Sequence, residues 1–190
     1  MQNLQVLGIP GSLRRDSLNR KALRIAMQFA AELGAEVGHA DLKELALPVY
    51  DGDVEAEGMP QSVLRLKAMV EAADALLIAS PEYNHSIPGG LKNAIDWLSR
   101  GRNSLDGKVV ALFGASNGQF GTARGQLAVR QTLGALNVLV LPQPLVYIRQ
   151  AEHAFQPDGS FQDSKTADLL KALVARALRV AALLKSDAAV

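Results

Sequence analysis

Residues 4–19 read LQVLGIPGSLRRDSLN, and this stretch decides how the rest of the chain is interpreted. Positions 4–9 are almost continuously apolar, as expected of a β-strand that is covered on both faces. A loop over 10–16 leads into residues 18–33, where apolar side chains recur at helical spacing until Gly34 ends the helix. A buried strand, a polar loop and an amphipathic helix in succession indicate the first unit of an α/β fold.

The same alternation continues to the end of the chain. Residues 41–58 are the exception, because they carry Pro48 and several acids, and we expect a loop there. Pro142 and Pro144 interrupt the last apolar run, which places that strand at an edge of the sheet. The pattern predicts further strands at 35–40, 75–79, 109–113 and 138–141, and further helices at 61–72, 91–98, 123–136 and 166–184.

Five strands in alternation with helices predict a doubly wound, five-stranded parallel sheet with helices on both faces. The expected strand order is 2-1-3-4-5, the flavodoxin-like arrangement, in one domain over residues 1–190. Ligands of such open sheets bind beyond the carboxyl ends of the strands, where the strand order reverses. The loops after the first, third and fourth strands are therefore the places to look for function.

Composition and charge exclude several classes of protein. The 190 residues contain 20 Lys and Arg against 19 Asp and Glu, and no basic run is longer than Arg14-Arg15, so we expect no nucleic-acid partner. The chain has no cysteine, which excludes a disulfide framework, a thiolate metal site and a cysteine nucleophile. Without a signal-like segment or an apolar run of transmembrane length, a cytoplasmic protein with no membrane partner is expected.

The first loop has the groups that bind a phosphate. Ser12 and Ser17 supply hydroxyls, Asn19 an amide and Arg14 a cation, and the following helix begins with unpaired N–H groups. The loop matches neither the Walker motif nor GxGxxG. In the alternative interpretation, Ser17 only caps the helix, while Arg14 and Arg15 lie on a solvated turn.

The second loop, residues 80–90, suits a flat heterocycle. Pro81 and Pro88 stiffen a segment that presents an aromatic ring, an amide and backbone groups. Alternatively, His85 is a plain surface residue and Glu82 a cap partner for the next helix. For Trp97, in that helix, we favour a position in the core.

The third loop, Gly114–Thr122, combines small residues with backbone N–H groups at the start of the helix that contains Arg124. Such a loop can approach a ring closely and donate hydrogen bonds to a carbonyl or to developing negative charge. We expect the N–H groups from Ser116 to Gly118 to be these donors. The alternative is that the glycines serve only a tight turn.

At these loops the sequence resembles the NADPH-dependent FMN reductase family of flavodoxin-like proteins, in its quinone and chromate reductase branch. The matching stretches are GSLRRDSLN (11–19), PEYNHSIPGGLKNAIDW (81–97) and GASNGQFGTARGQLAVRQTL (114–133). The second is long enough to be specific, whereas the first is characteristic only in combination with the others. The strand and helix plan extends the resemblance over nearly the whole chain.

The resemblance implies bound FMN, NAD(P)H as co-substrate and specific roles for the loop residues. One group is implied to hold the FMN phosphate: Ser12, Arg14, Ser17 and Asn19, with Leu13 and Leu18 through their backbone. A second group is implied to surround the ring and the ribityl chain: Pro81, Glu82, Tyr83, Asn84, His85, Ser116, Asn117 and Gly118. The sequence departs from the branch at His85, where relatives often carry Tyr.

The resemblance also bears on assembly. Relatives in this branch can join subunits through a Tyr at the position of Leu127 and a Glu at the position of Leu145. Two leucines cannot make that polar contact, so a homodimer is expected more securely than a homotetramer.

The implied reaction is ping-pong transfer of hydride from NAD(P)H to FMN and then to a quinone, chromate or a similar small-molecule acceptor. The flavin carries this chemistry, so no catalytic side chain and no metal are expected. Three alternatives remain beside it: an azo or nitro reductase of the same fold, a flavodoxin-type electron carrier and a receiver-like module. Carriers tend to be strongly acidic, and receivers need acids after the first strand, which ends in Gly8-Ile9-Pro10.

Access to the flavin is the last expectation from the sequence. We expect a cationic acceptor mouth formed by His85 with Arg100 or Arg102, beside a second subunit. An equal alternative is that the two arginines only interact with the dipole of the helix that they follow.

Overall fold

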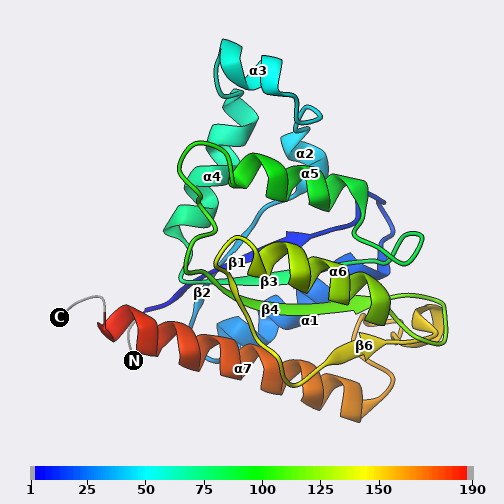
Figure 1. The fold of residues 1–190 in the computed structure, drawn as a ribbon. Helices are drawn as coiled ribbons and strands as arrows, with labels where there is room; N and C mark the ends of the chain where they lie inside the picture. The colour runs from blue at the N-terminus through cyan, green and yellow to red at the C-terminus, as the bar shows by residue number, and fades with distance from the viewer. Residues whose placement is uncertain (1–2, 188–190) are drawn as a thin grey trace.

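The computed structural model describes residues 3–187 and shows one parallel sheet between two layers of helices (Figure 1). The strand order is β2-β1-β3-β4-β5. This confirms the predicted order. The first residues of β4 pair with β5, and its last residues pair with β6. The strands are β1 (Gln5–Pro10), β2 (Glu36–His39), β3 (Ala75–Ala79), β4 (Val109–Ala115), β5 (Leu139–Val140) and β6 (Val146–Ile148).

Alternate residues of the central strands face two separate cores, because successive side chains of a strand point to opposite faces. Val6 packs on one side in the core beneath α1 and α7, whereas Leu7 packs on the other beneath α4, α5 and α6. Every residue of β3 and β4 is buried. The helices are α1 (Leu18–Glu32), α2 (Leu42–Leu45), α3 (Gly52–Glu57), α4 (Gln61–Ala72), α5 (Gly89–Leu98), α6 (Ala123–Gly134) and α7 (Ser164–Asp187).

The expectation of a loop over residues 41–58 was wrong, because α2 and α3 lie there. Asp41 and Asp51 each accept a hydrogen bond from the backbone N–H two residues later and so cap these short helices. The acids that suggested a loop are thus helix caps in part. In Figure 1, α3 projects from the body of the molecule.

The last predicted strand is divided into two. Only Leu139 and Val140 pair with β4 before the chain leaves the sheet, and Val146–Ile148 return to β4 as β6. Pro142 and Pro144 have no N–H for a ladder, so the edge position is filled by two short pieces. The sequence prediction placed the interruption correctly and missed β6.

The direction of the helices determines which residues can reach the carboxyl edge of the sheet. Each helix that links two parallel strands begins at that edge and returns to the amino edge. The first turns of α1, α5 and α6 therefore lie at the carboxyl edge. Residues 99–108, which follow α5, lie at the amino edge, where Lys108 Nζ donates to the Ala73 carbonyl just before β3.

Candidate functional site

The three loops selected from the sequence meet at one cavity of about 230 Å³ beyond the carboxyl ends of β1, β3 and β4. This is the place where the strand order reverses. Every residue that lines it, except Ala115, belongs to the set predicted from sequence. The lining consists of Ser12, Arg14, Ser17, Leu18, Asn19, Pro81, Glu82, Tyr83, Ala115, Ser116 and Asn117.

Four of the predicted cofactor residues do not line this cavity. Leu13 is exposed and its side chain lies close to Gly90 at the start of α5. Asn84 and His85 form the tip of a turn, and Gly118 is exposed in the third loop. These residues lie around the cavity rather than inside it.

The first loop presents backbone N–H groups that lack protein acceptors. Within the described chain, hydrogen bonds are recorded for the N–H of Gly11 and of Arg14, but for none between Arg15 and Asn19. Ser17 Oγ accepts from the Arg20 N–H at 3.3 Å, so Ser17 does cap α1. Its hydroxyl hydrogen remains available to a ligand.

Asn19 has a structural task that the sequence did not reveal. Its side-chain amide donates to the Ala115 carbonyl and accepts from the Ala115 N–H, both at 2.8 Å. Asn19 is buried, and this pair of hydrogen bonds joins the first turn of α1 to the end of β4. Asn19 thus fixes the first loop against the third, and its amide oxygen is already occupied.

Arg20 is a second cation near the first loop, but it is neutralised inside the protein. Both of its terminal nitrogens donate to the Asp41 carboxylate, at 2.5 and 2.6 Å. Burial raises the pKa of the Asp41 carboxyl, but hydrogen bonds from Arg20 and from the Lys43 N–H outweigh burial and hold this pKa below its usual value. Arg14 is therefore the arginine of this cavity that is free to bind an anion.

The second loop folds into a tight hairpin. The backbones of Tyr83 and Ser86 exchange hydrogen bonds of 3.3 and 3.0 Å across Asn84 and His85, whose φ values of 51° and 63° are both positive. This is the pattern of a type I′ turn. It holds Tyr83, of which 45% is exposed, at the cavity.

Glu82 does not cap the helix that follows it in sequence. Its carboxylate Oε2 accepts from the Gly125 N–H at 2.8 Å and so caps α6. A negative charge at a helix N-terminus is favourable, and here it joins the second loop to the third. Trp97 is fully buried, which confirms the preference for a core position.

Most of the N–H groups expected from the third loop are already in use. The Ser116 N–H donates to the Ile148 carbonyl at 3.0 Å, and the Gly118 N–H donates to Ser116 Oγ at 3.1 Å. No protein acceptor is recorded for the Asn117 N–H among the described residues. Of the three predicted donors, Asn117 is the one left for a ligand.

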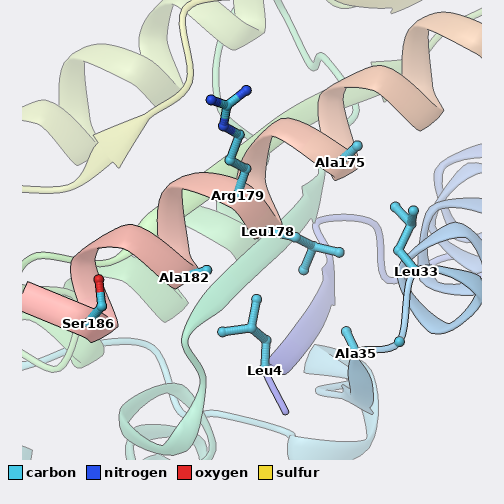
Figure 2. Close-up of a pocket in the computed structure, with 9 residues that line it drawn as sticks. Leu4, Leu33, Ala35, Ala175, Leu178, Arg179, Ala182 and Ser186 are labelled. Atoms are coloured by element: carbon cyan, nitrogen blue, oxygen red, sulfur yellow. The ribbon is translucent and has the colours of Figure 1, made fainter. Parts of the chain in front are cut away.

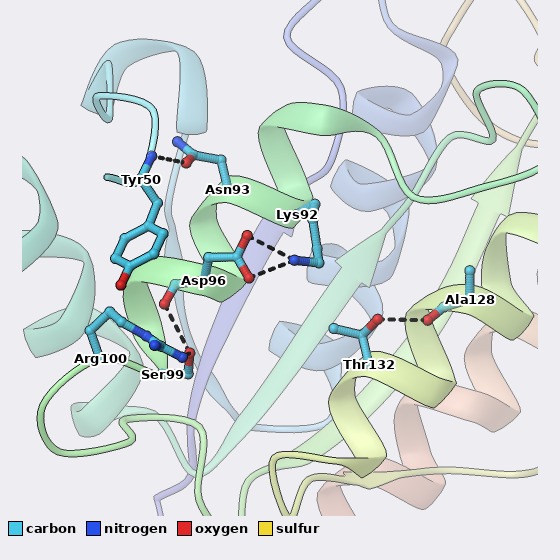
Figure 3. A network of polar contacts seen from close by, with 8 residues as sticks. All are labelled: Tyr50, Lys92, Asn93, Asp96, Ser99, Arg100, Ala128 and Thr132. Carbon is cyan, nitrogen blue, oxygen red and sulfur yellow. Dashed lines mark hydrogen bonds and ion pairs between the residues drawn. The ribbon is translucent and has the colours of Figure 1, made fainter. Parts of the chain in front are cut away.

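The structure does not bring Arg100 and Arg102 to His85. Figure 3 shows Arg100 beyond the end of α5, where it donates to Ser99 Oγ and lies 5.3 Å from the centre of the Tyr50 ring. Arg102 lines a different cavity at the amino edge, together with Lys108. Within a single chain His85 therefore does not meet Arg100 or Arg102, because α5 carries its last turn away from the carboxyl edge; an acceptor mouth completed by a second subunit stays a prediction.

The cation beside His85 is Arg124, which sequence reasoning named but did not place in the site. Its Nη1 lies 3.5 Å from His85 Nε2, and its guanidinium lies 4.5 Å from the centre of the Phe120 ring. Its position could have been found from the sequence, because Arg124 is in the first turn of a helix that begins at the carboxyl edge.

A larger cavity, of about 450 Å³, lies beside Leu4, just before β1 and so at the amino edge of the sheet (Figure 2). It lies between the end of α1 and the last turns of α7, and Leu4, Leu33 and Leu178 contribute to its lining. Apart from Arg179 and Ser186 its side chains are apolar, so it offers few groups that could orient a ligand. It is also remote from the loops that follow the strands.

The membrane and metal alternatives can be stated for the described part of the chain. Between residues 3 and 187, no helix has both the length and the apolar character needed to cross a bilayer. Over the same residues, no three acidic or histidine side chains gather where they could hold a metal ion.

Comparison with known proteins gives a consistent result. The model of the family described as NADPH-dependent FMN reductase matches residues 4–153. An NAD(P)H-dependent FMN reductase of Pseudomonas aeruginosa is 45% identical over 170 residues, which cover 89% of this chain and 90% of the relative. A quinone reductase of Escherichia coli K12 is 42% identical over 148 residues, 75% of this chain and 76% of the relative.

A solved structure agrees with these relatives. The flavoenzyme NAD(P)H:(acceptor) oxidoreductase of Paracoccus denitrificans superposes with a TM-score of 0.81 at 39% identity, covering 93% of this chain and 96% of that one. The family match spans all three loops that form the cavity. The resemblance seen in the sequence is thereby confirmed, and the chain belongs to the NADPH-dependent FMN reductase family.

Proposed function

We propose that the protein is an FMN-dependent NAD(P)H oxidoreductase that reduces a quinone or a similar small-molecule acceptor. The observation that carries this proposal is the set of anion-binding groups that line the cavity. Ser12 and Ser17 bring hydroxyls and Arg14 brings a guanidinium, and Ser17 is the N-cap of α1, so the first N–H groups of that helix lie beside them. Membership of the family supports the identity of the ligand.

The residues at the cavity fit a phosphate monoester. The loop N–H groups without protein acceptors would each bind an oxygen, and Arg14 would add a charge-assisted hydrogen bond. The acidic side chain of the lining, Glu82, is already bound by the Gly125 N–H. The cavity therefore offers several hydrogen-bond donors to a dianion, and the charge of its carboxylate is partly offset by the hydrogen bond from Gly125.

The size of the cavity determines how much of FMN it can enclose. Its volume of about 230 Å³ lies below the range of about 300–1,000 Å³ that encloses most of a drug-sized ligand. A ligand the size of FMN would therefore keep part of its surface outside, open to a second substrate. Bound FMN would supply the hydride acceptor and donor of a ping-pong reaction.

We assign the other lining residues by their free groups. Pro81 and Tyr83 provide rigid, apolar surface for the flavin, and the Asn117 N–H is a donor for a flavin carbonyl. Glu82 and Asn19 position the loops. The Glu82 carboxylate binds the Gly125 N–H, and the Asn19 amide binds the backbone of Ala115, so we assign neither group to the cofactor. We assign Leu13, Asn84 and His85 to the rim, where a second substrate enters.

We further propose that residues 1–190 form one FMN-binding domain that works in the cytoplasm as a homodimer. Leu127 on α6 is 65% exposed, which supports burial of this helix face against another subunit. With leucine at both 127 and 145, a tetramer joined by polar contacts has less support. Reduction of chromate is a further proposed activity, because chromate needs only to reach the reduced flavin to accept electrons from it.

Replacement of Arg14 by alanine should weaken FMN binding by about 10- to 100-fold, because a hydrogen bond to a charged group contributes roughly 1.5–3 kcal/mol. The matched control is Arg15→Ala, because Arg15 is also exposed on the same loop but does not line the cavity. Titration of each apoprotein with FMN, followed by flavin fluorescence, gives the two dissociation constants. Equal constants would remove Arg14 from the phosphate site.

The proposed activity is tested by steady-state kinetics of the FMN-loaded protein with NAD(P)H and a neutral quinone. We expect rapid NAD(P)H oxidation and parallel double-reciprocal lines, as in ping-pong turnover. An electron carrier would bind FMN but turn over NAD(P)H slowly, and a receiver-like module would bind no flavin. A panel of quinone, chromate, nitro and azo acceptors then separates quinone reduction from the activities that share this fold.

A further inference from the structure

Arg124 is an exposed cation that the FMN site does not use. It does not line the cavity, and no ion pair with a carboxylate is recorded for it within residues 3–187. Its recorded side-chain neighbours are His85 Nε2 at 3.5 Å and the Phe120 ring, whose centre is 4.5 Å away. Most of its N–H donors are therefore free to bind an anion.

The backbone that carries Arg124 is firmly held. The next residue, Gly125, donates its N–H to Glu82, and α6 packs so closely here that a Cβ on Gly125 would lie 3.1 Å from the Glu82 Cβ and 3.2 Å from the Ser86 carbonyl oxygen. The hairpin that presents His85 and Tyr83 is thus locked to the first turn of α6. The backbones that carry Arg124 and His85 are therefore held beside Glu82, which lines the cavity.

The Phe120 ring restrains the guanidinium further. A cation over an aromatic face is attracted to it, and an arginine held in this way loses less conformational entropy when it binds a ligand. Phe120 is itself 59% exposed, so burial of its ring in the core does not explain its position. The three side chains form a prearranged basic group outside the cavity, which we call the rim cluster: His85, Phe120 and Arg124.

The chemistry of the rim cluster indicates what it binds. A planar guanidinium fork is well suited to the oxygens of a phosphate monoester, and a histidine ring can add one more donor. Arg14, inside the cavity, already serves the phosphate proposed for FMN. The rim cluster lies outside that cavity and fits a phosphate monoester on a substrate that approaches from outside, and NADPH carries such a group on its 2′-oxygen whereas NADH does not.

We propose that Arg124, with His85 beside it, binds the 2′-phosphate of NADPH and makes the enzyme prefer NADPH to NADH. This assignment rests on the proposed function, because it requires that a nicotinamide nucleotide approaches FMN at this mouth. Arg124 is a specificity-determining residue in this account. The 2′-phosphate is remote from the reacting nicotinamide, so its contact stabilises the bound substrate and the transition state equally.

The test compares the two nucleotides in FMN-loaded Arg124→Ala, with a neutral quinone as acceptor. We expect the KM for NADPH to rise about tenfold or more with kcat unchanged, as expected when uniform binding is lost. Both constants for NADH should stay near those of the parent. Arg124→Lys should recover part of the loss, because it keeps the charge and loses the fork.

Arg102→Ala is the matched control, because it removes an arginine from the amino edge of the same protein. A binding measurement without turnover completes the test, with 2′,5′-ADP titrated calorimetrically into each FMN-loaded variant. We expect Arg124→Ala to bind 2′,5′-ADP about tenfold or more weakly than the parent and Arg102→Ala to bind it as the parent does. High salt should reduce the difference between parent and Arg124→Ala.

Three results would overturn the assignment. KM values for NADPH and NADH that rise together would show that Arg124 does not read the 2′-phosphate, and unchanged values would remove it from the site. A loss that appears with chromate and not with quinone, whichever nucleotide is used, would assign Arg124 to the acceptor. A parent protein that binds no FMN would refute the proposed function itself, which the first three results leave standing.

Discussion

Replacement of Gly114 by alanine should destabilise the protein by at least about 3 kcal/mol, at the upper end of what overpacking costs. An added Cβ would lie 2.1 Å from the Ser80 carbonyl oxygen and 2.3 Å from Thr122 Oγ1. The first of these atoms is backbone at the end of β3, and Thr122 is fully buried at the start of α6. Relief of the clash would therefore displace the second and third loops of the site together.

Gly134→Ala is the control for this prediction. Gly134 is the last residue of α6, and no atom lies within 4 Å of the position that its Cβ would take. Alanine there should be neutral or stabilise by up to about 1 kcal/mol, because glycine has more conformational freedom to lose on folding. Urea unfolding of both variants is the measurement. A Gly114→Ala protein as stable as the parent would contradict the close approach of the two loops.

Asn19→Ala is expected to cost about 2–4 kcal/mol, because both buried backbone groups of Ala115 lose their partner. The same change should weaken FMN binding, since Asn19 fixes the first loop relative to the third. Asn19→Asp distinguishes the two hydrogen bonds. The carboxylate can still accept from the Ala115 N–H, but it has no donor for the Ala115 carbonyl, so we expect aspartate to restore little of the lost stability.

The neighbouring amide of Asn117 provides the comparison for Asn19. Asn117 lines the same cavity but is exposed, and its replacement by alanine should change stability by less than about 0.5 kcal/mol. Thermal unfolding of the apoproteins ranks the variants. If Asn19→Ala and Asn117→Ala were equally stable, the side chain of Asn19 would not be joining α1 to β4 in solution.

The fold could be predicted from the sequence because its signals are local. The apolar runs of β1 and β3 are buried on both faces, and the amphipathic stretch of α1 covers one of these faces, so periodicity alone predicted these elements. The strand order followed from the alternation of strands and helices, which fits the flavodoxin-like arrangement. The crevice between β1 and β3 then followed from the order. Short elements such as α2 were not predicted, because four residues are too few to show a repeated pattern. The helix depends on its cap from Asp41 instead.

The composition of the site was also largely predictable, whereas the task of each residue was not. The loops after three parallel strands must share one edge of the sheet, so their residues were expected to meet. The partners of Asn19 and Glu82, however, lie 96 and 43 residues away along the chain, and no local pattern reports such contacts. Both residues were expected to contact the cofactor, and both hold loops together.

The arginines that follow α5 show the same limit of local reasoning. Arg100 and Arg102 follow the second loop closely in sequence, and α5 nevertheless carries them to the amino edge. Arg124 is farther along the chain, but it lies beside His85 because α6 begins at the carboxyl edge of the sheet, as α5 does. The direction of each crossover helix, more than distance along the chain, determines which charges reach the site.

The central claim is that the start of α1 holds the phosphate of FMN, and a comparison of FMN with riboflavin tests it most directly. The two ligands share the flavin ring and the ribityl chain and differ only in the phosphate. We expect the apoprotein to bind FMN at least about 100-fold more tightly than riboflavin, as expected for two or more charge-assisted hydrogen bonds. Equal affinity for FMN and riboflavin, measured by flavin fluorescence titration, would contradict the claim.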